Sequence, residues 1–175
     1  MHSLPHTRLQ VPDRHPQVTA VSELPTAHGL VWVAAVELDG LHVGTFENDG
    51  GGTATEFAPY DTSVYNVREF EVFAASCLRE GTAVTGEQVM ELLVEEYDTS
   101  VMVRDVKGHA GTYVRQVSGG RTSGYAEVDT RPSTYAEQVE MARQLMPRPV
   151  HSGTAVTWEI WTGDAWQPLP LPPYD

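Results

Sequence analysis

The fold is decided by one stretch of sequence, Gly29 to Gly52, which reads GLVWVAAVELDGLHVGTFENDGGG. Two runs of mostly apolar, β-branched and aromatic residues flank Asp39-Gly40. Asp-Gly between two such runs is the strongest short-range signal for a β-hairpin, because a type I′ turn needs positive φ at both central residues. The stretch therefore predicts a hairpin that turns at Asp39-Gly40.

This turn also sets a pairing register, because side chains alternate between the two faces of a strand. On the face that we expect to be buried, the pairs are Leu38/Leu41, Val36/Val43 and Ala34/Thr45. On the other face, the pairs are Glu37/His42, Ala35/Gly44 and Val33/Phe46. The hairpin then runs into the loop Asn48-Asp49-Gly50-Gly51-Gly52, which is the least ordinary run of residues in the chain.

Apolar residues at helical spacing, together with capping residues, predict three helices. They are expected at about 63–80 with an N-cap among residues 61–63, from Thr85 to about Arg104, and at 134–146. Thr85 with Gln88 and Thr134 with Glu137 form capping boxes. The segment 101–106 fits either a strand or a continuation of the second helix, and we favour the helix.

The remaining pattern predicts strands. They are expected at 53–58, at 112–117 paired with 124–128, and in a hairpin of 154–161 with 165–169 that places Trp161 opposite Trp166. Strands, then helices, then strands again predict an α+β fold in which two or three helices pack on one face of an antiparallel sheet. We expect a single domain over 23–167, an extended N-terminal arm over 1–22, and a Pro-rich tail over 168–175 in the polyproline II conformation.

Both ends carry apolar residues that would anchor them. At the N-terminus these are Leu4, Leu9, Val11 and Val18, and at the C-terminus they are Leu169, Leu171 and Tyr174. Isolated termini of this composition are normally mobile, so an ordered arm is expected to lie on the body of its own chain or on a neighbouring chain. Arms exchanged between subunits would make a homo-oligomer.

The composition is acidic, with 24 Asp and Glu against 11 Lys and Arg, a net formal charge of −13. This charge disfavours binding to a nucleic-acid phosphate backbone. Plain solubility is the ordinary explanation for such a charge, and the alternatives are a basic protein partner or mimicry of a polyanion. Residues 1–16 lack the apolar segment of a secretory signal, and no apolar run is long enough to span a membrane. We therefore expect a cytoplasmic protein of a bacterial host. Cys77, the only cysteine, excludes an intramolecular disulfide and is expected in the core.

The common catalytic motifs are absent, and the sequence predicts no cofactor and no metal site. The glycines at 50–52 fit an anion-binding nest of backbone N–H groups, or a loop that needs positive φ or passes close to another segment. His28 and His42 could meet Asp49 and form a general base held by a carboxylate, or they are surface histidines.

The second predicted helix is rich in acids, namely Glu87, Glu91, Glu95, Glu96 and Asp98. A solvated face is the ordinary explanation for such a cluster. The alternative is a contact surface for a basic partner, for which we single out Glu91 and Glu95.

The pattern D-G-x-x-V-G-x-x-x-N-D-G-x-G, from Asp39 to Gly52, resembles small uncharacterised bacterial and phage proteins. Those proteins place an N-D-G-x-G-G loop after a first hairpin and follow it with acidic helices. The present chain departs from them by a plain glycine run with no cysteine or asparagine after it. The resemblance covers roughly residues 31–117, implies no activity, and favours an accessory protein of a phage or mobile element.

Three functional hypotheses follow from the sequence. The leading one is a non-enzymatic acidic protein that acts through protein–protein contacts. The second is a small hydrolase or ligand-binding enzyme centred on the loop at 47–52, which requires Asp49, His28 and His42 to converge on one pocket. The third is a virion or assembly component.

Overall fold

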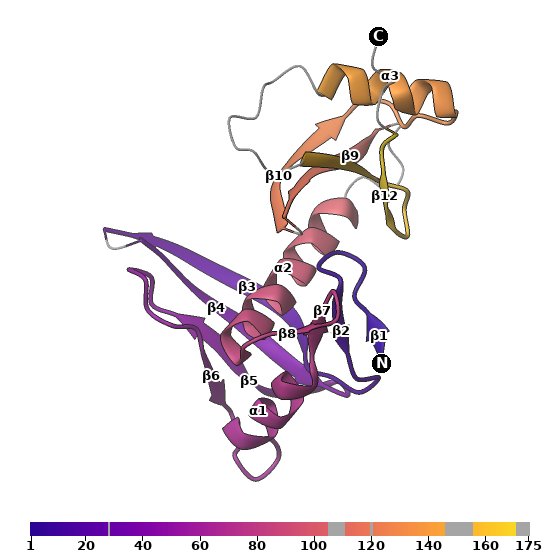
Figure 1. The fold of residues 1–175 in the computed structure, drawn as a ribbon. Coiled ribbons are helices and arrows are strands. Elements are labelled where there is room, and N and C mark those ends of the chain that lie inside the picture. Colours follow the sequence, from indigo (N-terminus) through magenta and orange to yellow (C-terminus); the bar gives the residue numbers. More distant parts are fainter. Residues whose placement is uncertain (28, 105–110, 120, 146–155, 171–175) are drawn as a thin grey trace. The chain divides into compact units, whose positions relative to one another are not determined.

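The computed structural model describes residues 1–27, 29–104, 111–119, 121–145 and 156–170 (Figure 1). Within them, all paired strands run antiparallel and form three four-stranded sheets, accompanied by three helices. The expected α+β class with antiparallel sheet is confirmed. The strands form three sheets where we expected one. None of the described helices combines the length and the apolar character needed to cross a membrane.

The chain divides into two compact units, residues 1–101 (unit 1) and 102–175 (unit 2). We expected instead a single domain over 23–167 with an arm and a tail. The sequence marks no linker at the division because the division falls inside helix α2 (Gly86–Arg104), which has no Pro- or Gly-rich break there. The helix also favours the helical interpretation of 101–106 as far as Arg104; residues 105 and 106 lie outside the described ones.

The main sheet of unit 1 is built on the predicted hairpin. Its strands are β3 (Gln17–Thr26), β4 (Gly29–Leu38), β5 (Leu41–Asn48) and β6 (Glu56–Pro59), in the order β3-β4-β5-β6. Asp39 and Gly40 have φ of 54° and 78°, the positive values that a type I′ turn requires. The predicted turn is therefore confirmed.

A bulge changes the register of this hairpin beyond the turn. The two pairs next to the turn are as predicted, Leu38/Leu41 and Glu37/His42. The register then shifts by one residue at Val43, so that Ala34 faces Phe46 instead of Thr45, and the four pairs predicted beyond this point are wrong. The shift buries both Val43 and Phe46, and burial of a phenylalanine outweighs the loss of one regular pair.

Helix α1 (Val67–Ser76) is shorter at both ends than the predicted helix over 63–80. Its N-cap is Asn66, whose side chain accepts a hydrogen bond from Glu69 N at 3.1 Å, while the Glu69 carboxylate accepts one from Asn66 N at 2.8 Å. Asp61 instead accepts from Ser63 N at 2.9 Å and closes a turn before the helix. The reciprocal capping box at Asn66 therefore decides where the helix begins.

Residues 1–22 do not form a separate arm. They contain β1 (His2–Ser3), β2 (Leu9–Val11) and the beginning of β3, and the first two join β7 (Leu78–Arg79) and β8 (Thr82–Ala83) in a sheet of order β1-β2-β7-β8. The predicted anchors are buried in the core of unit 1, namely Leu4, Leu9, Val11 and Val18. Strands of two or three residues leave no periodicity in the sequence, and the N-terminal segment packs on its own unit.

The core of unit 1 joins the sheet to both helices. Its members from the sheet are Ala34, Val36, Val43, Phe46 and Phe57, and those from the helices are Phe70, Phe73, Ala74, Val89, Met90, Leu92 and Leu93. Cys77 is fully buried among them, which confirms its place in the core. Helix α2 begins with the predicted capping box, since Gln88 N donates to Thr85 Oγ1 at 3.2 Å.

Unit 2 follows the sequence prediction closely. It contains β9 (Thr112–Ser118), β10 (Arg121–Val128), α3 (Tyr135–Leu145), β11 (Val156–Trp161) and β12 (Trp166–Pro168), with the sheet order β10-β9-β11-β12. Trp161 pairs with Trp166 as predicted, and their ring centroids lie 5.3 Å apart. Glu137 N donates to Thr134 Oγ1 at 3.2 Å, which confirms the capping box of α3.

The sheet of unit 2 has apolar clusters on both of its faces. One cluster contains Val114, Ala142, Ile160 and Leu169, and the other contains Val103, Trp161 and Trp166. Leu169 N also donates to Trp158 O at 2.8 Å, so the described part of the tail packs on unit 2. Leu171 and Tyr174 lie outside the described residues.

Candidate functional site

The glycine loop after β5 is closed by its own side chains. Asn48 Oδ1 accepts from Gly50 N at 2.8 Å, and Asn48 Nδ2 donates to Thr53 O at 3.1 Å. Thr53 N in turn donates to Gly50 O at 3.2 Å. These bonds hold residues 48–55 in a compact loop and delay the start of β6 to Glu56, three residues later than predicted.

The loop needs glycine for reasons of backbone geometry. Gly50, Gly51 and Gly52 have φ of 73°, 63° and 83°, a region that other residues rarely adopt. A Cβ on Gly50 would lie 3.1 Å from Leu30 O, and one on Gly29 would lie 3.1 Å from Gly51 N. The loop thus passes close to the start of β4, which supports the structural interpretation of the run over an anion-binding nest.

Two residues of the hypothetical catalytic group, His42 and Asp49, are not brought together. His42 lies at the beginning of β5 and Asp49 follows its last residue, so seven steps of about 3.4 Å separate them by about 24 Å along the strand. The exposed His42 ring packs against Tyr60, with centroids 5.7 Å apart. His28 lies outside the described residues. The hydrolase hypothesis therefore loses the pocket on which it depended.

Helix α2 has an acidic face. Glu91, Glu95 and Asp98 recur at helical spacing on one side of the helix, and Glu91 and Asp98 are exposed. Although Asp98 is exposed as a residue, neighbouring atoms remove part of the water around its carboxylate, and this desolvation, together with repulsion from Glu23 on β3, raises the pKa of Asp98. The acidic face therefore continues from α2 to the edge of the main sheet, within unit 1.

Glu96 does not belong to this face, because it turns towards the N-terminal segment. Its carboxylate accepts from Thr7 N at 2.8 Å, from Thr7 Oγ1 at 2.9 Å and from His6 N at 3.1 Å. Burial raises the pKa of Glu96, and these hydrogen bonds oppose that shift. Glu96 also lines a pocket of about 180 Å³ beside His15. No local sequence signal links Glu96 to residues that lie some 90 positions away, so the sequence prediction missed this contact.

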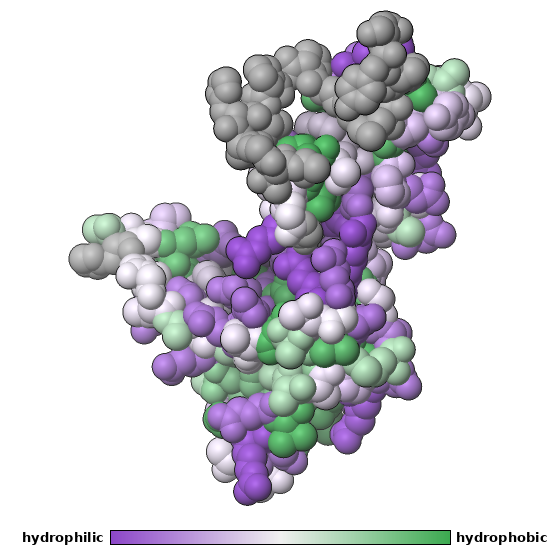
Figure 2. Space-filling model, viewed as in Figure 1, coloured by the Kyte–Doolittle hydropathy of each residue, from purple (hydrophilic) through white to green (hydrophobic). Residues whose placement is uncertain are grey.

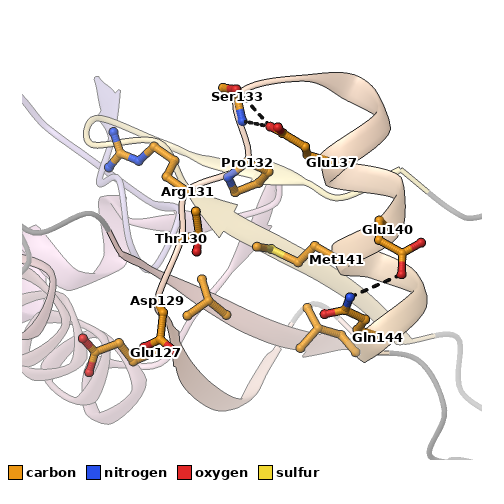
Figure 3. A pocket seen from close by; sticks show the side chains of 12 residues that line it. Glu127, Asp129, Thr130, Arg131, Pro132, Ser133, Glu137, Glu140, Met141 and Gln144 are labelled. Carbon is orange, nitrogen blue, oxygen red and sulfur yellow. Dashed lines mark hydrogen bonds between the residues drawn. The ribbon is translucent and has the colours of Figure 1, made fainter.

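Unit 2 contains an open groove of about 660 Å³ between α3 and the loop that follows β10 (Figure 3). Val128, Met141 and Leu145 form its apolar side and also pack against the core of the unit. Figure 3 shows Glu127 and Asp129 at one end of the groove. The sequence prediction missed this groove because the loop at 129–134 has no motif.

Most of the charges around this groove are already engaged. Glu137 accepts from Ser133 N at 2.7 Å, and hydrogen bonds from Ser133 and Thr134 lower its pKa. Glu140 accepts from Arg143 at 2.8 Å. The Arg131 guanidinium points away, towards Gly163 at the turn between β11 and β12. The groove therefore has one apolar side and an otherwise polar lining, with two carboxylates at one end.

No known protein family, curated protein or solved structure matches this chain. The resemblance of the glycine loop to bacterial and phage proteins accordingly stays a prediction. Among the described residues, no three His, Cys, Asp or Glu side chains gather as metal ligands would.

The net charge is distributed unevenly between the two units. Residues 1–101 contain 16 acidic and 4 basic residues, a formal charge of −12. Residues 102–175 contain 8 acidic and 7 basic residues, a formal charge of −1. Of the surfaces considered, the acidic face of unit 1 has the most pronounced chemical character.

Proposed function

We propose that this chain is a non-enzymatic binding protein that contacts a basic protein partner through unit 1. The observation that carries the proposal is the concentration of 12 of the 13 net negative charges on residues 1–101. The separation of His42 from Asp49 supports a binding role over hydrolysis. We also propose that the chain is an accessory protein of a phage or mobile element. Only the resemblance of the glycine loop supports this part of the proposal.

The few cations of unit 1 do little to weaken its negative field. Arg14 is paired with Asp39 at 2.6 Å, and Arg8 lies 4.0 Å from Glu80. With 16 acidic and 4 basic residues, unit 1 keeps a large excess of negative charge. A field of one sign over a whole unit raises the rate of encounter with oppositely charged partners, and salt screens it over about 8 Å at physiological ionic strength.

The test compares two charge reversals of equal size. Glu91→Lys with Asp98→Lys changes the charge of unit 1, and Glu127→Lys with Asp129→Lys changes the charge of unit 2 by the same amount. All four side chains are exposed, so neither pair disturbs a core. The probe is a fluorescent ten-residue lysine peptide, with a ten-residue glutamate peptide as the control ligand.

We expect the lysine peptide to bind the full chain at low salt and to lose affinity as salt is added. The reversal in unit 1 should weaken binding at least about fivefold, roughly 1 kcal/mol, and the reversal in unit 2 should have less effect. Equal losses in the two variants, or no binding by the unaltered chain, would overturn the proposal. Capture from a host lysate followed by mass spectrometry would then identify the natural partner.

A further inference from the structure

Strand β3 is the edge of the main sheet of unit 1. The sheet order β3-β4-β5-β6 gives β3 a strand neighbour, β4, on one side only among the described residues. All side chains from Ser22 to Thr26 are exposed, and the end of the β3–β4 hairpin projects from unit 1 (Figure 1). An edge strand presents a row of backbone N–H and C=O groups that another strand can pair with.

Pro25 shows which backbone groups face outward. It pairs with Leu30 within the β3–β4 ladder, and proline has no N–H to donate. Proline in a strand occupies a position whose N–H would point away from the neighbouring strand. Since the two directions alternate along an antiparallel strand, Glu23 and Val21 also direct their N–H and C=O groups outward.

The edge is protected at its two ends and open in the middle. A bulge interrupts the register between Val18 and Ala20, and Pro25 removes one outward donor near the turn. Between the bulge and Pro25, residues 20–24 form a regular stretch of strand. In this stretch, Val21 and Glu23 each direct both an N–H and a C=O group outward. This stretch is long enough for a short added strand.

The two faces beside the open edge differ in chemistry. Glu23 pairs with Trp32, which packs against the core, so Glu23 lies on the face of the sheet that α2 covers, where it interacts with Asp98. On the opposite face, Leu24 is 63% exposed and Val33 is 39% exposed. Figure 2, in which apolar residues are green, shows green surface at the projecting end of this hairpin.

We propose that the open edge of β3 takes an extended strand from the basic partner, with lysine or arginine opposite Glu23 and an apolar residue opposite Leu24. Side chains of an added strand alternate between the same two faces, so one face meets Glu23 and Asp98 and the other meets Leu24 and Val33. A basic residue there would relieve the repulsion between the two carboxylates. The proposal rests on the proposed function for the charge of the partner.

A second copy of this chain is the competing occupant of the edge. The charge of −12 on unit 1 opposes pairing of two copies and favours a basic strand. Salt separates the two cases, because screening weakens the contact with a basic strand and strengthens the contact between copies.

The experiment uses the full chain and two variants of one exposed residue. Glu23→Gln removes the charge but keeps the outward N–H, and Glu23→Pro removes both while leaving the β3–β4 ladder intact. The probe is a seven-residue peptide with capped ends that alternates lysine and valine and begins and ends with lysine. Its control has the same composition and the same capped ends, but its four lysines come first and its three valines follow. Binding is followed by fluorescence anisotropy, and hydrogen exchange reports the amides of Val21 and Glu23.

We expect the alternating peptide to bind more tightly than the control and to slow exchange at both amides. Glu23→Gln should weaken binding about two- to fivefold, and Glu23→Pro should weaken it by a further factor of about two to ten. Equal binding by the two variants would overturn the strand-addition proposal while leaving the charge-based proposed function in place. A chain that sediments as a dimer, becomes monomeric in Glu23→Pro and ignores the peptide would assign the edge to a second copy instead.

Discussion

Each unit contains a glutamate whose carboxylate is buried or partly buried. The carboxylate is paired with an arginine in unit 2 and accepts hydrogen bonds from neutral donors in unit 1. In unit 2, Glu159 is 3% exposed and pairs with Arg115, whose Nε lies 2.8 Å and Nη2 2.7 Å from Glu159 Oε2. In unit 1, Glu96 is held by neutral donors from His6 and Thr7. The unit whose glutamate has a cationic partner is also the nearly neutral one: the formal charge is −1 for unit 2 and −12 for unit 1.

The comparison teaches what each carboxylate can do for its unit. A buried ion pair depends on both partners, because removal of one leaves the other charged and without compensation. A carboxylate held by N–H and O–H donors keeps those bonds in part when it is protonated. Unit 2 should therefore be sensitive to mutation at its buried charge, and unit 1 should be sensitive to pH at its own.

The largest expected effect is in unit 2. Glu159→Ala leaves Arg115, which is 2% exposed and lies 4.5 Å from the Trp166 ring, without its carboxylate, and should destabilise unit 2 by about 3–5 kcal/mol. Three of the four tryptophans belong to unit 2, namely Trp158, Trp161 and Trp166, so tryptophan fluorescence during urea unfolding reports this unit.

The matched control replaces both partners with apolar residues. Arg115→Met with Glu159→Leu removes the pair without leaving a lone charge, and should cost less than Glu159→Ala alone. A double variant that is less stable than the single one would show that the ion pair stabilises unit 2 by itself.

A smaller effect is expected at the turn of the hairpin in unit 1. Gly40 has φ of 78°, and a Cβ added there meets no atom within 4 Å, so backbone strain is the only cost of a substitution. Gly40→Val should lower the stability of unit 1 by about 1–3 kcal/mol, and Gly40→Asn by less, because asparagine tolerates positive φ. Thermal melting followed by circular dichroism measures both variants. Equal melting temperatures for the two would contradict the assigned turn.

The features predicted correctly from the sequence are the ones set by neighbouring residues. The Asp39-Gly40 turn, the capping boxes of α2 and α3, and the Trp161/Trp166 pair each depend on residues within a few positions of one another. Such local signals also predict the α+β class and the strands of unit 2.

The features missed from the sequence depend on distant contacts. The bulge at Val43 arises because Phe46 gains burial against α1 and the rest of the core, where its ring lies 5.4 Å from that of Phe70. The N-terminal strands exist only through pairing with residues 78–83. Neither contact is visible in the periodicity of the segment concerned, and the same holds for the edge of β3 and the groove of unit 2.

The smallest effect concerns the pH dependence of unit 1 through Glu96, whose pKa is raised by burial above its usual value of 4.5. The folded state therefore binds a proton at Glu96 more readily than the unfolded state does. By linkage, the free energy of unfolding rises as the pH falls through the pKa of Glu96 in the folded state towards its pKa in the unfolded state. At pH values above the folded-state pKa, this gain in stability is absent. Glu96→Gln cannot titrate, so this contribution disappears in the variant.

We therefore expect the difference in unfolding free energy between the unaltered chain and Glu96→Gln to move in favour of the unaltered chain as the pH falls from 7 towards 4.5. The other groups around Glu96 include His15, whose pKa is lowered by burial and by repulsion from His2, and Asp98, whose pKa is raised. Both are present in the two proteins and cancel in the difference. Glu91→Gln, on the exposed face of the same helix, controls for the loss of one negative charge. Parallel pH curves for the unaltered chain and Glu96→Gln would show that burial does not govern this carboxylate, and the contrast with Glu159 would then rest on Arg115 alone.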